Sequence, residues 1–199
     1  MEAEPSIKEL RRTPKQSRSI KTVERLLGCA AVVLEGGGYD GFSMQSVADE
    51  AGMAIGTVYQ YFPDKYAILQ TLVERWYEKT ESVHLAAHST YDYVLKYAEV
   101  YTKEPGASAL LDAIQAVPKL RAFDRSKVDE AIHRTAIEFA DGGDPTARDY
   151  ARARVLTITV DSVLRAAIRL PASETALLIN ELERLLTTIL TDTTDTKPV

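Results

Sequence analysis

The stretch SMQSVADEAGMAIGTVYQYFPDK, residues 43–65, predicts two short helices joined by a tight turn. Its first half spaces apolar residues three and four positions apart, and Ser43 stands before them, where a hydroxyl caps a helix. Gly52 ends this helix, because glycine adopts left-handed backbone angles at little cost. The second helix places Val58 and Phe62 on one face and ends before a proline. Two short helices around a glycine turn are the pattern of the helix-turn-helix motif.

The second of these helices carries side chains that suit the major groove of DNA. Gly56, Thr57, Tyr59, Gln60 and Tyr61 are small or hydrogen-bonding, and no acidic residue lies among them. A helix in that groove needs a small N-terminal end, neutral groups for base edges and no carboxylate facing the phosphates. The pattern favours a recognition helix; the alternative is a surface helical hairpin that binds nothing.

The same segment resembles the tetracycline-repressor (TetR) family over about a third of the chain, roughly Pro14 to Leu72. The match is tightest over the family's run G-T-[VL]-Y-x-[YH]-F-x-x-K. In this chain that run is made of Gly56, Thr57, Val58, Tyr59, Tyr61, Phe62 and Lys65. Two departures are Ala54, where the family often has a capping serine or threonine, and Ile55, where a polar or basic residue is frequent. Both departures concern the bases that the helix contacts.

Composition is that of an ordinary soluble protein. The 199 residues are 45% hydrophobic and 27% charged, and no uncharged run approaches the length that spans a bilayer. The N-terminus lacks the apolar core of a signal peptide, so nothing indicates export. Cys29 is the single cysteine, which allows no internal disulfide and fits a reducing cytoplasm. We expect a cytoplasmic protein with no membrane association, in which Cys29 is a small, buried side chain.

Charge is divided unevenly along the chain. Residues 1–25 hold seven basic and four acidic side chains, a net +3, so the formal total of −5 leaves −8 for the rest. This asymmetry suits a protein that places one end on a polyanion. Residues 1–12 are equally well explained as a disordered, solubilising tail.

Helical periodicity predicts an all-α fold of about nine helices, with no strand-like alternation. The first helix opens at the capping sequence Thr13-Pro14-Lys15-Gln16 and ends at Gly36-Gly37-Gly38. Its inward stripe is expected to be Ile20, Val23, Leu27, Ala30, Ala31 and Leu34. A long helix follows Asp64, and further helices are expected at residues 88–103, 107–117, 119–140, about 146–170 and 173–190.

The expected organisation has two domains and two flexible ends. Residues 1–13 form a flexible basic arm and residues 14–63 a three-helix, helix-turn-helix DNA-binding domain. Residues 64–191 form a helical ligand-binding and dimerisation domain, and residues 192–199 a flexible tail. The long helix after Asp64 is the only obvious rigid link between the two domains.

The last two helices predict a homodimer. Between residues 155 and 168 apolar side chains occur almost all round the helix, and a helix that is apolar on every side must be covered on every side. A second copy of the chain supplies the cover if two helices from each copy form a four-helix bundle. The expected interface residues are Val155, Ile158, Leu178, Leu182, Leu185 and Ile189. A well-buried monomeric core is the alternative.

The family resemblance implies a ligand-responsive repressor that leaves a palindromic operator when a small effector binds. It also implies a ligand pocket inside the second domain. The side chains that are expected to line it are Trp76, Tyr97, Tyr101, Leu111, Ile114, Phe123, His133, Ile137 and Val163. Together they favour an apolar or aromatic effector with a few polar contacts, although each alone is an ordinary core residue.

DNA contacts follow from the same resemblance and from the side-chain chemistry. Residues nearest the base edges are expected to be Gln45, Thr57, Tyr59 and Gln60. Phosphate contacts are expected from Ser43, Tyr61 and Lys65, and screened attraction from Arg11, Arg12, Lys15 and Arg18. A phosphate at the start of the fourth helix would also offset the unfavourable position of Lys65 in that helix's first turn.

Other candidate sites are weaker. His84 and His88 have the spacing of a metal pair but need a third ligand, from Asp92 or His133, so we expect no metal. Asp161 and Arg165 interrupt an apolar helix and are expected to pair with each other; a polar anchor for the ligand is the sharper alternative.

No nucleophile motif, phosphate loop or cysteine cluster is present, so we expect neither an enzyme nor a cofactor. Two further classes remain possible. One is a helical small-molecule-binding protein without specific DNA binding, and the other is a non-specific DNA-coating protein.

Overall fold

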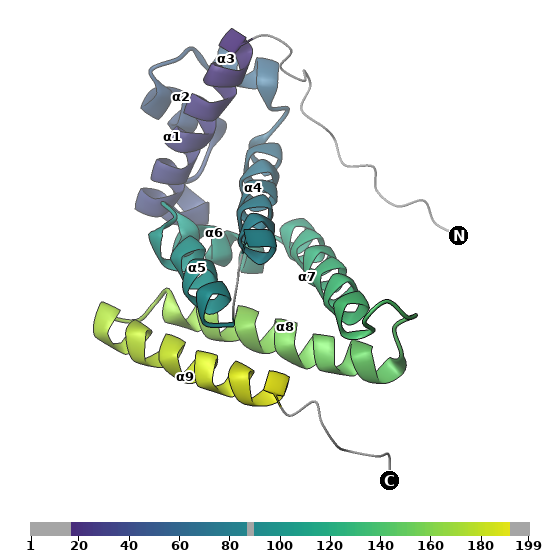
Figure 1. The fold of residues 1–199 in the computed structure, drawn as a ribbon. Coiled ribbons are helices and arrows are strands. Elements are labelled where there is room, and N and C mark those ends of the chain that lie inside the picture. The colour runs from purple at the N-terminus through teal and green to yellow at the C-terminus, as the bar shows by residue number, and fades with distance from the viewer. Residues whose placement is uncertain (1–16, 87–89, 192–199) are drawn as a thin grey trace. The chain divides into compact units, whose positions relative to one another are not determined.

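The computed structural model describes residues 17–86 and 90–191, which form nine α-helices with no strand among them (Figure 1). The helices are α1 (Ser17–Gly41), α2 (Met44–Ala51), α3 (Ile55–Tyr61), α4 (Lys65–Ala86), α5 (Thr90–Lys103), α6 (Ala107–Ala116), α7 (Pro118–Phe139), α8 (Ala147–Ala167) and α9 (Ala172–Thr191). The expected all-α fold of about nine helices is confirmed. None of the described helices is both long and apolar enough to cross a membrane.

The chain forms two compact units. One comprises the described residues up to Arg75 together with Pro105–Leu120, and the other comprises Trp76–Glu104 and the described residues from Arg121 onward. The helix α4 therefore begins in the first unit and ends in the second. The helix α6, which we had grouped with the second domain, belongs to the first unit because it packs on α1.

The first unit is built around the inward face of α1. Val23, Leu27, Ala30 and Leu34 are buried there as expected, whereas Ile20, near the start of α1, is 47% exposed. The inward face also includes Leu26, Leu27's neighbour, which the sequence pattern missed. A break falls at Gly38, whose φ of 59° and ψ of −169° are not helical.

The turn before α6 has room only for glycine. Gly106 has a φ of +73°, and a Cβ there would lie 2.9 Å from the carbonyl oxygen of Ala31 on α1. Both the left-handed backbone and the close approach exclude a side chain at this position. The helix that follows buries the apolar side chains Ala107, Leu110, Leu111, Ala113 and Ile114.

The second unit is a bundle in which α5 packs against both α8 and α9, and α8 packs against α9 (Figure 1). A cluster of Ile132, Ala136 and Ala153 joins α7 to α8. The helix α8 begins with a capping box in which the Thr146 side chain accepts a hydrogen bond from the Asp149 amide and the Asp149 side chain accepts one from the Thr146 amide. The buried side chains of the last two helices include Val160, Leu164, Leu182 and Leu186.

Candidate nucleic-acid interface

The first helix of the motif is fixed at both ends by local chemistry. Ser43 Oγ accepts a hydrogen bond from the Ser46 amide at 3.0 Å, and Ser46 Oγ accepts one from the Ser43 amide at 2.9 Å. At the other end Gly52 has a φ of 60°, and the Met53 amide donates to the Ala48 carbonyl at 2.9 Å. The serine cap and the glycine turn are both confirmed, and together they set the angle at which the chain enters α3.

The helix α3 is held by one face and exposes the other. Val58 and Phe62 are fully buried, as the spacing predicted. On the other side Gly56, Tyr59 and Gln60 are exposed. The helix Ile55–Tyr61 therefore presents small and hydrogen-bonding groups to solvent, which is what a helix in the major groove requires.

Two polar residues predicted to contact DNA are already engaged within α2. The Ser43 hydroxyl donates to Ser46 Oγ at 3.0 Å, and the Gln45 amide nitrogen donates to Asp49 Oδ1 at 2.7 Å. Both side chains are exposed. A DNA group at either position would have to replace or share one of these bonds.

Lys65 lies at the start of α4 but is turned toward the α1–α2 connection. Its ammonium donates to the Phe42 carbonyl at 3.3 Å and lies 4.2 Å from the centre of the Tyr39 ring. Asp64 Oδ1 accepts a hydrogen bond from the Ala67 amide at 2.9 Å. The carboxylate of Asp64 thus occupies part of the position where we expected a phosphate, and Tyr39 and Phe42 offset the electrostatic cost of Lys65 there.

The basic arm lies outside the described residues. This holds for Arg11, Arg12 and Lys15, and for the side chain of Arg18. The same applies to the side chains of His84 and His88. Among the residues whose side chains are described, no group of three potential metal ligands comes together.

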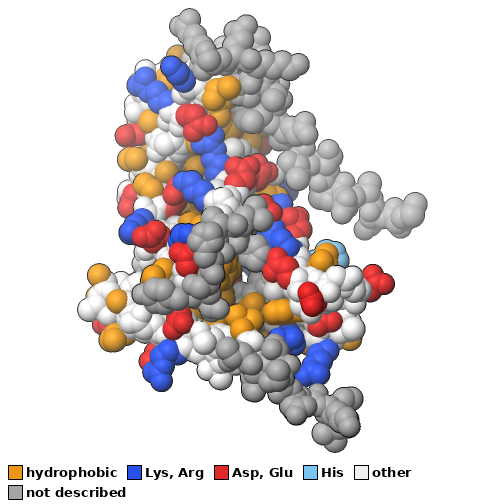
Figure 2. All heavy atoms as spheres, viewed as in Figure 1, with side chains coloured by type: hydrophobic (Ala, Val, Ile, Leu, Met, Phe, Trp, Pro, Cys, Tyr) orange, Lys and Arg blue, Asp and Glu red, His pale blue; other side chains and the backbone are white. Residues whose placement is uncertain are grey.

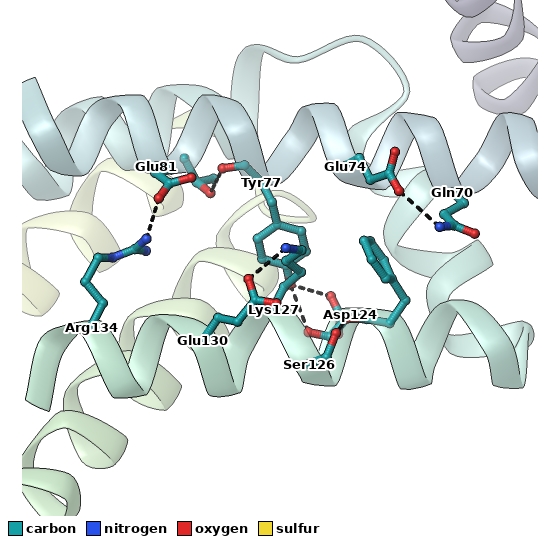
Figure 3. A network of polar contacts seen from close by, with 11 residues as sticks. Gln70, Glu74, Tyr77, Glu81, Asp124, Ser126, Lys127, Glu130 and Arg134 are labelled. Carbon is teal, nitrogen blue, oxygen red and sulfur yellow. Dashed lines mark hydrogen bonds and ion pairs between the residues drawn. The ribbon is translucent and has the colours of Figure 1, made fainter. Parts of the chain in front are cut away.

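Inside the second unit, five side chains from α4, α5, α7 and α8 form one polar chain, which we term the Arg165 network. Tyr77 Oη donates to Asp124 Oδ1 at 2.6 Å, and Arg165 Nη2 donates to the same oxygen at 2.8 Å. Arg165 Nε donates to Asp161 Oδ2 at 2.7 Å, and Tyr101 Oη donates to Asp161 Oδ1 at 2.7 Å. The expected pairing of Asp161 with Arg165 is confirmed. Figure 3 shows Tyr77 pointing from α4 toward Asp124 on α7.

The electrostatics of the Arg165 network keep its donors protonated. Burial, reinforced by Asp161, raises the pKa of the Tyr101 phenol well above its usual value, and burial beside Asp124 raises the pKa of Tyr77. Burial alone would lower the pKa of Arg165, but Asp161 and Asp124 more than offset it and raise that pKa. The network holds two carboxylates and one guanidinium in a largely buried place, so it favours a compensating positive or hydrogen-bond-donating group.

Aromatic rings adjoin this network. The ring centres of Trp76 and Tyr101 are 4.7 Å apart in an edge-to-face contact, those of Tyr97 and Tyr101 are 5.5 Å apart, and those of Tyr93 and Tyr97 are 5.2 Å apart. Burial raises the pKa values of Tyr93 and Tyr97 as well. Three residues of the expected ligand-pocket set, Trp76, Tyr97 and Tyr101, are thus brought together.

Two other residues of the expected ligand-pocket set, His133 and Ile137, lie away from these rings. Ile137 is 48% exposed and His133 is also exposed, because α7 turns Ile132 and Ala136 toward the core instead. His133 Nδ1 lies 2.6 Å from the Tyr150 hydroxyl. The expectation that His133 and Ile137 line a ligand pocket is therefore wrong, because neither side chain lies in the interior of the second unit.

Four residues of the ligand-pocket set remain. Leu111 and Ile114 belong to α6 and to the first unit, so they are not among the side chains that the second unit gathers. Phe123 and Val163 are half-buried in the second unit.

The expected interface residues divide into exposed and buried ones. Val155 and Ile158 on α8 are 57% and 46% exposed, and Leu185 on α9 is 46% exposed. Leu182 is only 2% exposed, because it lies on the face of α9 that packs within its own subunit, and it cannot serve as an interface residue. Leu177, at 67% exposed, was not in the expected set. Figure 2 shows hydrophobic side chains reaching the surface among charged ones over this part of the molecule, while Leu178 and Ile189 are half-buried.

Sequence reasoning missed Tyr77 and Asp124. Asp124 lies 41 residues from Arg165 and Tyr77 lies 47 residues from Asp124, so no helical spacing links them. The chemistry of Arg165 could have indicated a further partner. Within one turn, its own helix supplies one carboxylate, Asp161, whereas a guanidinium has five N–H donors that need acceptors.

The Gly52 turn joins α2 to α3, and α3 exposes an uncharged face while it packs on the core of the first three helices. This arrangement defines a helix-turn-helix DNA-binding protein. Residues 26–72 match the family described as bacterial regulatory proteins, tetR family, and residues 72–194 match the tetracyclin repressor-like C-terminal domain. The chain therefore belongs to the TetR family. It is a DNA-binding transcriptional regulator and not an enzyme.

Individual relatives agree with this assignment. The HTH-type transcriptional repressor KstR of Mycolicibacterium smegmatis is 28% identical over 161 residues, which cover 76% of this chain and 79% of that protein. A transcriptional regulator from Rhodococcus sp. Rha1 has the same fold with a TM-score of 0.67 at 20% identity, covering 88% of this chain and all of that one. Salmonella enterica GusR also aligns with a TM-score of 0.67 at 20% identity, over 89% of this chain and all of its own.

Proposed function

We propose that this protein is a homodimeric repressor that binds a palindromic operator in the cytoplasm and is released from it by a small apolar or aromatic effector. The observation that carries the proposal is the exposed, uncharged face of α3, held at a fixed angle by Val58 and Phe62. Two copies of this helix would enter successive major grooves about one helical turn, roughly 34–36 Å, apart. Similarity to the KstR repressor supports repression rather than activation.

Base contacts in this proposal come from Thr57, Tyr59 and Gln60, with Gln45 at the edge of the groove. Tyr61, Ser43 and Lys65 would contact phosphates, and the basic arm would add salt-dependent attraction. Lys65 would reach a phosphate only by giving up its contact with the Phe42 carbonyl.

The effector would bind in the second unit beside the Trp76, Tyr97 and Tyr101 rings. Aromatic and apolar surface would supply most of its affinity, and the Arg165 network would orient any polar group that it carries. By linkage, the effector weakens DNA binding by the same factor by which DNA weakens effector binding.

Dimerisation would cover the exposed apolar side chains of α8 and α9, including Val155, Ile158, Leu177 and Leu185. Such exposure of large apolar residues on two adjacent helices is unfavourable in water, and a second copy of the same surface removes it.

Titration of the protein with DNA from upstream of its own coding sequence tests the DNA-binding part of the proposal. We expect a specific complex with one dimer per site and an affinity at least about a thousandfold above that for random DNA at the same salt concentration. Equal affinity for both DNAs would instead indicate a non-specific coating protein. No binding to either would indicate a helical small-molecule-binding protein.

A further inference from the structure

The first residue of α3 is a large apolar side chain that is only partly buried. Ile55 is 36% exposed, whereas the two other apolar anchors of α3, Val58 and Phe62, are fully buried. Val58 and Phe62 therefore anchor α3 more completely than Ile55 does. The part of the Ile55 side chain that stays in water contributes no hydrophobic free energy to folding.

The residues on either side of Ile55 have no hydrogen-bonding side chain. Ala54, at the N-cap of α3, is exposed and makes no side-chain capping bond. Gly56 follows, and a Cβ built on it would meet no atom within 4 Å. From Gly52 to Pro63 the sequence contains no charged residue. At the N-terminal end of α3 the side chains of residues 54–56 are therefore apolar or absent, and none is charged.

This tip is the part of the recognition helix that meets base edges. In helix-turn-helix proteins the N-terminal residues of the second helix contact base edges in the major groove. There, guanine, adenine and cytosine present hydrogen-bonding groups, and thymine alone adds a methyl group at C5. A side chain without donors or acceptors that covers a polar base edge leaves that edge without its water, at a cost in free energy.

We propose that Ile55 contacts the C5-methyl group of a thymine in each half of the operator and so selects a T·A pair at that position. The inference rests on the proposed DNA-binding function. Tyr59, one helical turn farther along and 42% exposed, lies beside this contact and brings a hydroxyl for a neighbouring hydrogen bond.

Deoxyuridine differs from thymidine only by the missing methyl group, which makes it a direct probe. The operator is first selected from random DNA, and each thymine of a half-site is then replaced by deoxyuridine in turn, in both halves. Affinities are measured by titration at one salt concentration for the wild type, for Ile55→Ala and for Val32→Ala. Val32 is a matched control, because it is 50% exposed but lies on α1.

With wild type and Val32→Ala, we expect at least one thymine at which deoxyuridine weakens binding by about fourfold per half-site, the effect of one buried methyl group. With Ile55→Ala the same replacement should change affinity by less than about 1.5-fold, because the partner of the methyl group is gone. Melting temperatures of the three proteins verify that all remain folded.

If no thymine shows a penalty that depends on Ile55 while specific operator binding persists, the inference is wrong and the proposed function stands. If no operator can be selected at all, the proposed function fails, and the inference fails with it. The two failures are therefore distinguishable in one experiment.

Discussion

At the scale of single residues, three glycines differ in what an added side chain would meet. Gly106 combines a φ of +73° with a Cβ position 2.9 Å from the Ala31 carbonyl oxygen. Gly142, in the loop before α8, has a φ of +86° but open space around it, and Gly56 has open space and ordinary helical angles. A comparison of the three positions therefore separates the cost of a left-handed backbone from the cost of a close contact.

Alanine at each of the three positions should rank them by free energy of unfolding. Gly142→Ala should cost about 1–2 kcal/mol for the left-handed backbone, and Gly106→Ala should cost more, because Ala31 must also move. Gly56→Ala should be stabilising by up to about 1 kcal/mol, as for any exposed helical glycine. Urea denaturation followed by circular dichroism measures all three. A Gly106→Ala variant as stable as Gly142→Ala would contradict the tight contact between this turn and α1.

Gln60 is the exposed side chain of α3 best suited to a two-bond contact with adenine. Gln60→Ala should reduce discrimination at one base pair by about 1–3 kcal/mol and leave the other positions of the operator unchanged. Competition titrations against operators with single base-pair changes measure this. Uniform weakening across all sequences would assign Gln60 to phosphate contact instead.

At the scale of helices, the Arg165 network couples α4, α5, α7 and α8 through buried tyrosines whose pKa values are raised. In the unfolded chain a tyrosine ionises near pH 10, whereas in the folded protein Tyr77 and Tyr101 stay neutral above it. Their contribution to stability is therefore complete below pH 10 and is lost as pH rises toward the folded values.

The free energy of unfolding should fall above pH 10 by about 1.4 kcal/mol per pH unit for each such tyrosine. Tyr101→Phe should make that fall shallower by one tyrosine, while lowering stability at pH 7 by about 1 kcal/mol through the lost hydrogen bond to Asp161. Tyr59→Phe, at an exposed position, is the control and should leave both quantities unchanged. An identical alkaline slope in Tyr101→Phe and wild type would show that this phenol ionises freely in the folded state.

Local sequence patterns predicted the features that depend on residues nearby in the sequence, such as helix caps and turns. They missed the contacts between residues that are far apart in the sequence. The Ser43 cap, the Gly52 turn and the burial of Val58 and Phe62 all follow from spacings within one helix. The leucine stripe of α9 was predicted too, but periodicity does not say which neighbour covers which residue, so Leu182 was assigned to a partner subunit although its own subunit buries it. Asp124 and Tyr77 escaped for the same reason, since their contacts join separate helices.

At the scale of the whole molecule, the exposed and buried leucines of α9 make opposite predictions for one type of substitution. Leu185→Glu, at a 46% exposed position, should yield folded monomers that no longer bind the operator. Leu182→Glu, at a 2% exposed position, should unfold the second unit instead, because it places a charge in the core. Sedimentation velocity combined with circular dichroism separates the two outcomes. A Leu185→Glu variant that remains dimeric would place the interface elsewhere.

The close fit of Gly106 against Ala31 brings Pro105–Leu120 back to the unit that ends at Arg75, so the polypeptide crosses from one compact unit to the other three times. A hybrid regulator made by exchanging N-terminal segments at residue 75 would consequently separate α1 from the helix that completes its packing. Joining a different ligand-binding domain to this DNA-binding unit would require the transfer of both stretches of sequence. For the same reason, a protease that cuts between Glu104 and Pro105 would not release an intact DNA-binding unit.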